Sequence, residues 1–333
     1  MKITKKTLTN LVLLVFAAGV FIWIGFKTDW EKTWSSIRSA NLSWLGTSLI
    51  FMLGAHWCRG ARWTLLTEPA GYKLNARRSF YSVMVGYLVN VATSRGGEIV
   101  RSAITAKSEK APVELLIGTV VTERIVDFIM LFFVCLAALA LQFKYIYSFF
   151  DTYIITPLSE KLSWETMGLL ILILAGIAFI LFRLRKKNKS GKTQEKKGIW
   201  GIIARFSEGL KTVFELKSPS KFIVLSFGIW VGYWLSGWCV MKSLAVTEHF
   251  GILTALSLVV FSSIGIAIPL PAGAGVWGAV SFGLQTVYGM STANADTYGI
   301  YTIAISNLIM IIFGAVCYFL LYFEMQKLQK NAA

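Results

Sequence analysis

Three charged residues interrupt one long apolar segment, and they are the strongest sign of chemistry in the sequence. The motif 122–127 (TERIVD) lies inside the apolar run 115–141. On a helix, Glu123 and Asp127 are i, i+4 neighbours and Arg124 precedes Asp127 by three residues. An isolated charge at membrane depth costs about 3 kcal/mol even on permissive insertion scales, so these side chains should pair inside the protein or face water. Either they form a salt-bridged cluster that holds helices together, or they bind a lipid headgroup or a proton.

Two other polar stretches lie at the ends of apolar runs. In the segment 95–101 (RGGEIVR), two glycines let the backbone approach a neighbour closely, and Glu98 and Arg101 share a face of the helix that would follow. A helix that begins after these glycines can hold a phosphate with its exposed N–H groups, whereas the alternative is a solvated turn. Arg62, beside Trp63, indicates either an interfacial anchor or a site that attracts anionic headgroups.

The remaining polar residues show no pattern typical of an enzyme. His56 and His249 are the only histidines, they are far apart, and neither has partners at metal-ligand spacing. Nucleophile-elbow, P-loop and dinucleotide motifs are absent from the sequence. Glu123 and Asp127 could act as an acid/base pair, but no nucleophile accompanies them. We therefore expect no catalytic site, no metal and no cofactor, with both histidines at the membrane interface and the four cysteines as reduced packing residues.

The elements that must position these residues are membrane helices. Hydrophobic residues make up 56% of the 333 residues and charged residues only 15%, an apolar share above that of soluble domains. The long apolar runs are 11–26, 115–141, 167–182, 222–241, 252–270 and 300–322. A bilayer core about 30 Å thick needs roughly 20 helical residues to cross it. The composition therefore predicts an all-α, polytopic integral membrane protein with one transmembrane domain over 1–333, and its first run reads as an uncleaved helix.

The basic residues are distributed as topology signals. The net charge is +16, yet the lysines and arginines flank apolar runs and form no aromatic-lined groove, so we expect no nucleic-acid partner. Segment 183–221 contains 12 Lys/Arg, whereas 290–298 contains none. The positive-inside rule then predicts that 183–221 is a cytoplasmic loop able to associate with anionic lipid, and that both termini of this inner (plasma) membrane protein are cytoplasmic.

Two of the apolar segments do not fit as simple crossings. Segment 80–94 would carry the basic stretch 95–114 outside, so we predict that it dips into the membrane from the cytoplasm and returns. Pro269, Pro271, Gly273 and Gly275 likewise interrupt 252–290, and this pair would dip from outside. We expect about six full spans and two interrupted, re-entrant hairpins, arranged as an inverted pseudo-repeat like those that build midplane sites in transporters. A plain eight-span topology is the alternative.

Taken in order, these motifs resemble a known family. The likeness rests on 62–66 (RWTLL), Asn90 followed by 97–101 (GEIVR), 123–127 (ERIVD) and 269–275 (PLPAGAG). Together they are similar to the transmembrane region of lysylphosphatidylglycerol synthases and its stand-alone relatives. The resemblance implies a flippase, and the chain, which ends at Ala333 without the soluble aminoacyl-transfer domain, looks like the transporter half alone.

The sequence departs from the family at the proline-glycine motif. The usual Pro-Gly-Gly is Pro271-Ala-Gly273, and the acidic residue common shortly afterwards falls near Gly278. A missing carboxylate favours a headgroup different from that of a cationic aminoacyl lipid.

The function we expect is passive or ion-coupled movement of a phospholipid or glycolipid between leaflets, since no nucleotide motif is present to drive it. A headgroup-modifying membrane enzyme and a scaffold for an envelope-biosynthesis enzyme are the alternatives, and assembly into a homo-oligomer stays open. The residues expected to contact the lipid lie in four motifs. They are Arg62, Asn90, Glu98, Arg101, Glu123, Arg124, Asp127, Pro269, Pro271, Gly273 and Gly275. The charged residues of 98–127 should converge on one polar cavity open toward the cytoplasmic leaflet, with the break 269–275 facing it across the midplane.

Overall fold

The described part of the protein is helical throughout. The computed structural model describes residues 30–93, 96–143, 212–268, 270 and 273–330, together with the single residues 145, 147, 151 and 156. The α-helices are α2 (Trp30–Arg38), α3 (Leu42–Thr67), α4 (Ala76–Ala92), α5 (Gly97–Glu109), α6 (Val113–Leu141), α11 (Pro219–Ser243), α12 (Ile252–Ala267), α13 (Ala274–Thr286) and α14 (Thr292–Lys330). Two short 3-10 turns, Glu68–Ala70 and Thr212–Phe214, accompany them, and no strand occurs among the described residues. The predicted all-α class is therefore confirmed.

Three of these helices are long and apolar enough to cross a membrane. They are Val113–Leu141, Pro219–Ser243 and, within α14, Thr292–Lys327. Only 6% of the most apolar window of α6 is buried inside the protein, and its outward face exposes Ile125, Phe128 and Phe132 by more than half. Such a face suits contact with lipid rather than water. The predicted runs 11–26 and 167–182, and most of the basic loop 183–221, lie outside the described residues.

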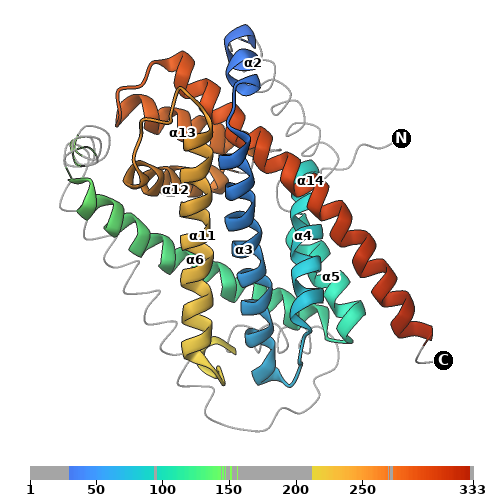
Figure 1. Ribbon diagram of the computed structural model, residues 1–333. Helices are drawn as coiled ribbons and strands as arrows, with labels where there is room; N and C mark the ends of the chain where they lie inside the picture. The colour runs from blue at the N-terminus through green and yellow to red at the C-terminus, as the bar shows by residue number, and fades with distance from the viewer. Residues whose placement is uncertain are drawn as a thin grey trace, which may run out of the picture.

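Helices α3 and α11 form the central antiparallel pair, side by side along most of their length (Figure 1). Small residues let their backbones approach: Gly232 of α11 faces Ala55 of α3, and Gly228 faces Cys58. Close packing of this kind holds helices together in lipid, where burial of apolar surface supplies little driving force. The pair therefore gives α3 a fixed position from which to present its arginines.

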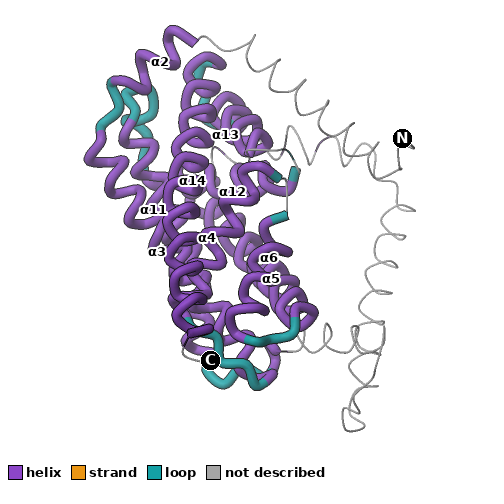
Figure 2. Tube along the Cα trace, turned by 90° about the vertical axis from the view of Figure 1, so that its right-hand side faces the viewer, coloured by secondary structure: helices purple, strands orange, loops and turns teal. Residues whose placement is uncertain are grey.

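Two helical hairpins flank this pair, as the sequence predicts. One is α4–α5, with its break at 93–96, and the other is α12–α13, with its break at 268–273. The first lies toward the end of the molecule where the chain finishes, and the second toward the end where α2 lies (Figure 2). Pro269 and Pro271 are outside the described residues, whereas Gly273 starts α13 in a left-handed conformation with φ +75°.

Both hairpins are closed by a pair of glycines. In α4–α5, a side chain at Gly86 would lie 2.9 Å from the carbonyl oxygen of Gly97, and in α12–α13 one at Gly265 would lie 2.5 Å from the carbonyl oxygen of Gly275. Neither contact leaves room for a Cβ, because real Cβ atoms do not approach that closely. The same backbone contact thus brings the two arms together in each hairpin.

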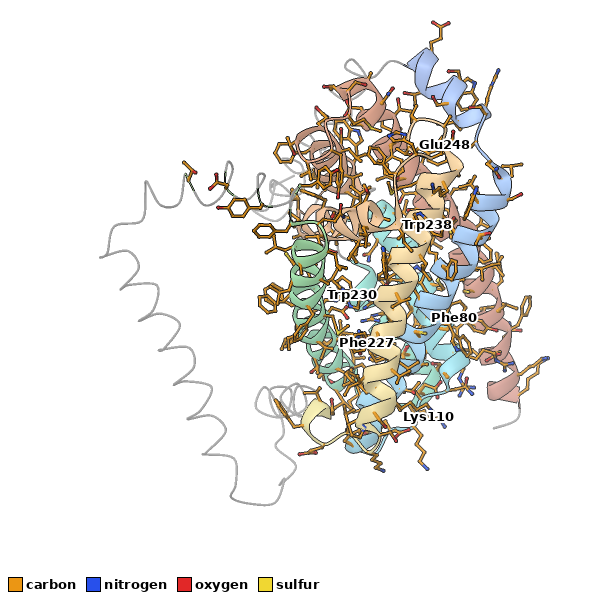
Figure 3. The ribbon with its side chains drawn as sticks, turned by 60° about the vertical axis from the view of Figure 1, so that its left-hand side comes forward. Phe80, Lys110, Phe227, Trp230, Trp238 and Glu248 are labelled. Atoms are coloured by element: carbon orange, nitrogen blue, oxygen red, sulfur yellow. The ribbon has the colours of Figure 1, made fainter. Side chains whose placement is uncertain are left out.

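The long helix α14 connects the two hairpins. Its Gly299 packs against Trp277 of α13, and its Gly314 packs against Leu88 of α4. Its last turn carries Lys327 and Lys330. Along the long axis of the molecule, Glu248 lies near one end and Lys110 near the other (Figure 3).

Candidate functional site

The charged residues of α6 meet two arginines of α3. Arg59 Nη1 donates to Asp127 Oδ2 at 2.8 Å, and Arg62 Nη2 donates to Asp127 Oδ1 at 2.7 Å. Arg62 also lies 3.6 Å from Glu123 Oε1, and the side chains of both residues are fully buried. Arg59 and Arg62 lie three residues apart on one face of α3, and Glu123 and Asp127 lie four residues apart on one face of α6. The basic face of α3 therefore packs against the acidic face of α6.

A third arginine comes from the α4–α5 hairpin. Arg101 of α5 donates to Glu123, and its guanidinium also lies over the ring of Trp63, 4.7 Å from the centroid. Trp63 is held in place because its Nε1 donates to Thr119 Oγ1 at 2.9 Å. Glu123 therefore joins α5 to α3 and α6 inside the protein. Breaking such a buried pair is costly, because the remaining charge has no solvent.

A more exposed ion pair lies next to this buried cluster. Arg124 Nε lies 2.9 Å from Glu98 Oε1, and Arg124 Nη1 lies 3.6 Å from Asp127 Oδ2. The side chain of Arg124 is 44% exposed and that of Glu98 35% exposed. These two residues can move outward in a way that the buried cluster cannot.

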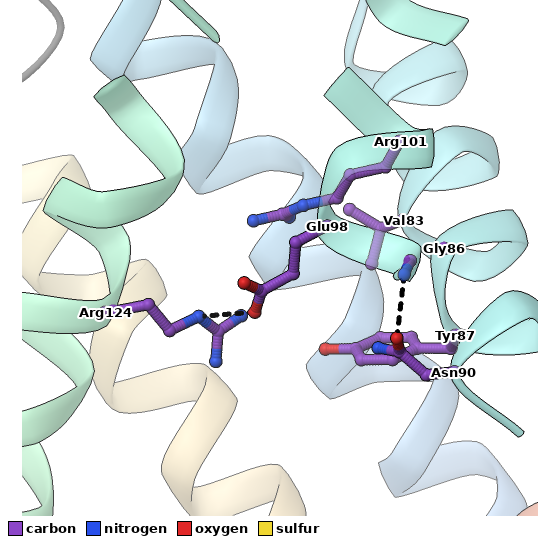
Figure 4. Close-up of a pocket in the computed structure, with 8 residues that line it drawn as sticks. Val83, Gly86, Tyr87, Asn90, Glu98, Arg101 and Arg124 are labelled. Carbon is purple, nitrogen blue, oxygen red and sulfur yellow. Dashed lines mark hydrogen bonds and ion pairs between the residues drawn. The ribbon is translucent and has the colours of Figure 1, made fainter. Parts of the chain in front are cut away.

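A narrow, open pocket, with enclosed room for about one water molecule, lies between this pair and the α4–α5 hairpin. Its walls come from α4, α5 and α6. The lining residues are Val83, Gly86, Tyr87, Asn90, Gly97, Glu98, Arg101 and Arg124 (Figure 4). Asn90 shapes the inner wall, since its Oδ1 accepts the backbone N–H of Gly97 at 2.8 Å. The hairpin break thus places the first turn of α5 directly at the pocket.

The charges around the pocket do not cancel. The ion pairs connect four arginines, Arg59, Arg62, Arg101 and Arg124, with the three carboxylates of Glu98, Glu123 and Asp127. The Nε atoms of the three buried arginines have no hydrogen-bond partner among the described residues. The network therefore carries one uncompensated positive charge, and of the three buried arginines it is Arg101 that lines the pocket.

Aromatic residues close the site on the side of α11. Arg59 Nη2 lies 3.4 Å from Tyr233 Oη, and His56 lies between the rings of Tyr87 and Tyr233, at centroid distances of 4.6 and 5.8 Å. His56 is only 2% exposed, so the expectation that it is interfacial is wrong. Among the described residues, no group of three or more His, Cys, Asp or Glu side chains could hold a metal ion.

Most of the residues expected to contact a lipid lie together. Glu98, Arg101, Glu123, Arg124 and Asp127 form one network, which Arg62 connects. Two more complete the set: Arg62 pairs inside it and Asn90 lines its pocket. Because Arg62 is fully buried, its interpretation as an interfacial anchor is wrong.

Gly273 and Gly275, the described glycines of the proline-glycine break, do not line this pocket. Gly275 packs against Gly265 in its own hairpin, and Gly273 lies toward Ile303 of α14. Pro269 and Pro271 are outside the described residues. Two further site residues, Arg59 and Tyr87, were not expected from the sequence. The three-residue spacing of Arg59 from Arg62 is the signal that points to the first, whereas nothing in the sequence singles out the second.

The sequence was compared with known proteins. The sequence model of the lysylphosphatidylglycerol synthase TM region matches residues 10–314. The chain belongs to this family. It is 26% identical to UPF0104 membrane protein MJ1078 of Methanocaldococcus jannaschii over 253 residues, which are 74% of this chain and 98% of that protein.

A second relative is similar over a shorter region. UPF0104 membrane protein MJ1595 of the same organism is 28% identical over 129 residues, or 38% of this chain and 37% of that protein. No solved structure matches the chain. The three apolar spans and the family together establish an integral membrane protein.

Proposed function

We propose that the protein moves a phospholipid or glycolipid between the two leaflets of the inner (plasma) membrane, without nucleotide hydrolysis and without changing the lipid chemically. The observation that carries the proposal is the half-exposed Arg124 at the mouth of a charged pocket, on a helix whose outer face is apolar. A lipid headgroup in the pocket would be shielded from hydrocarbon, while the acyl chains of the same lipid would stay on the apolar outer face of α6. Charges at this depth mark substrate pathways in many membrane proteins.

The hairpins support the same proposal. Interrupted helices at membrane depth are tolerated where they are buried in protein or line a polar cavity, and Asn90 and Gly97, on the two sides of the α4–α5 break, line the pocket. In our proposal both hairpins are re-entrant and enter from opposite sides of the membrane. That arrangement is the one that inverted-repeat transporters use to alternate access to a central site.

For orientation, we propose that the end of the molecule with Lys110, Lys217 and Lys327 is cytoplasmic. Both termini and the 183–221 loop, which we also propose to contact anionic lipid, would then lie on that side. A reporter cysteine at Lys110 should be labelled only from inside in oriented vesicles, and one at Glu248 only from outside. Labelling of Lys110 from outside contradicts the orientation.

The experiment that tests the function is a lipid-scrambling assay. Purified protein is reconstituted into liposomes with a headgroup-labelled phospholipid, and a membrane-impermeant reductant is added. Protein-free liposomes lose about half of the label, and the protein should carry the loss beyond half. Mass spectrometry of the same lipids distinguishes the alternatives: an altered headgroup indicates an enzyme, and neither movement nor alteration indicates a scaffold.

A further inference from the structure

We infer that the pocket between α4, α5 and α6 takes the phosphate of a lipid headgroup with net negative charge, and that the Glu98 carboxylate occupies part of this place until the lipid displaces it. The inference deepens the proposed lipid transport and rests on it. It names the chemical class of the substrate, and it gives Glu98 a role as an internal substitute for the ligand.

The first observation is the position of the α5 N-terminus. This 13-residue helix begins at Gly97, which lines the pocket, and it carries partial positive charge at that end. The contact with Gly86 leaves no side chain between the first turn and the pocket wall. Asn90 holds the turn in place by accepting the Gly97 N–H. Helix starts of this kind bind phosphate groups.

The second observation is independent of the helix end. Arg101 is 3% exposed and lines the pocket, and its Nε has no hydrogen-bond partner among the described residues. Its Nη2 is already engaged by Glu123, and its Nε is shielded from solvent, so this donor becomes available to a different acceptor only when the pocket opens. A buried guanidinium with an unused donor beside a helix N-terminus favours an anion with several acceptor oxygens.

The third observation is the present position of Glu98. Figure 4 shows its carboxylate pointing toward the Arg124 guanidinium, with the Arg101 guanidinium on the same side of the pocket. Both members of the Glu98–Arg124 pair are partly exposed, so the pair can open without stranding a buried charge. An incoming phosphate would take Arg124 from Glu98, which can turn to solvent. With Glu98 turned away, the four arginines face only Glu123, Asp127 and the phosphate, so one positive charge still remains and favours a headgroup with net negative charge.

The surroundings favour a lipid over free phosphate as the source of this group. One turn after Arg124, Phe128 is 72% exposed, and Phe132, one turn further, is 57% exposed. These side chains continue from the mouth of the pocket along the apolar face of α6. A lipid with its phosphate at Arg124 could lay an acyl chain along this strip, whereas inorganic phosphate would gain nothing from it.

Binding is measured by calorimetry on the full-length protein in an uncharged detergent. Four probes separate phosphate, charge and acyl chain: dihexanoyl phosphatidylglycerol, zwitterionic dihexanoyl phosphatidylcholine, dodecanoate and inorganic phosphate. We expect phosphatidylglycerol to bind most tightly. Equal affinity for dodecanoate would overturn the preference for phosphate, equal affinity for phosphatidylcholine would overturn the preference for negative charge, and equal affinity for inorganic phosphate would overturn the lipid source.

Three variants test this arrangement, and they are expected to change the affinity for phosphatidylglycerol in different directions. Arg124→Gln should weaken phosphatidylglycerol binding about tenfold, the low end for losing a charge-assisted hydrogen bond. Glu98→Gln should tighten it, because the internal competitor is gone. Arg77→Gln is the matched control: Arg77 also makes a partly exposed ion pair, 2.7 Å from Glu324, but it lies outside the pocket. Its affinity should equal that of the wild type.

Equal affinities in all three variants, or weaker binding in Glu98→Gln, would overturn the displacement of Glu98. These results can be told apart from failure of the proposed function. If the protein scrambles lipids but shows no preference for phosphatidylglycerol, the inference fails and transport stands. If phosphatidylglycerol binds with the expected variant pattern but no lipid crosses the bilayer, the site stands and transport fails.

Discussion

The two hairpins share a backbone contact but differ completely in charge. Each is closed by facing glycines, Gly86 with Gly97 in α4–α5 and Gly265 with Gly275 in α12–α13. The α4–α5 arms supply Glu98 and Arg101 to the ion-pair network, whereas residues 252–286 contain no charged residue at all. The second hairpin instead contributes to the largest apolar core, with α11 and α14. The glycine contact is thus common to both hairpins, whereas the charged side chains lie on only one of them.

The largest expected difference between the hairpins concerns buried polar groups. Glu123→Leu should lower the free energy of unfolding by about 3–5 kcal/mol, because it leaves Arg101 buried without its acidic partner. Ser281→Ala, in α13, removes a hydroxyl that donates to Asp296 and should cost only about 1 kcal/mol. Thermal unfolding in detergent measures both. The double variant Glu123→Leu with Arg101→Met should regain most of the loss; if it does not, the ion pair is not the cause.

The glycine contacts should be equally sensitive in the two hairpins. Gly97→Ala and Gly275→Ala each force a Cβ against a carbonyl oxygen of the opposite arm and should destabilise by about 1–3 kcal/mol, as overpacking does. Gly278→Ala, where no atom lies within 4 Å of the new Cβ, is the control and should be neutral. A large effect in only one hairpin would show that the resemblance between them is superficial.

The rate of lipid transport should distinguish the two hairpins more clearly than the free energy of unfolding does. Arg124→Gln should slow lipid scrambling about tenfold through loss of a charge-assisted contact. It should change stability by less than about 1 kcal/mol, because its ion pair is partly exposed. Ser263→Ala in α12 removes a hydroxyl that donates to the Val259 carbonyl of its own helix, and should leave the rate unchanged. Wild-type scrambling in Arg124→Gln would assign the network a structural role.

The smallest expected effect is local. Asn90→Ala removes the acceptor for the Gly97 N–H and should cost about 1 kcal/mol. Hydrogen exchange should become faster in the first turn of α5. The first turn of α13, which starts at Gly273 without a side-chain cap, should exchange as in the wild type. Unchanged hydrogen exchange at Gly97 would mean that another group protects its amide.

Much of this site follows from the sequence, and the reason is the cost of charge in lipid. Glu123 and Asp127 within an apolar run require cationic partners, and the Gly-Gly segment before Arg101 indicates the chain break that can supply one. The sequence cannot choose among partners that are distant along the chain. Arg59 and Arg62 stand at a helix end, where arginines usually contact headgroups, so only the packing of α3 against α6 reveals them as buried.

The glycine contacts could not have been predicted from the sequence. Gly86 and Gly265 lie within apolar helices and resemble ordinary small residues, and their partners depend on how each hairpin folds back. The roles of Tyr87 and His56 depend likewise on the position of α11, whose Tyr233 completes the aromatic group. The spacing of residues along one helix can be read from the sequence, whereas the face of the neighbouring helix that those residues contact cannot.

The pairing of Asp127 with Arg59 and Arg62 has a consequence for biogenesis. The partners are separated by 68 and 65 residues, so during synthesis both arginines reach the membrane before the carboxylate that neutralises them. They lie in the last three turns of α3, which ends at Thr67, and from there long side chains can extend to the water interface. Both arginines can therefore stay hydrated until α6 inserts. Because Asp127 follows the arginines in the sequence, their burial is a late step of assembly.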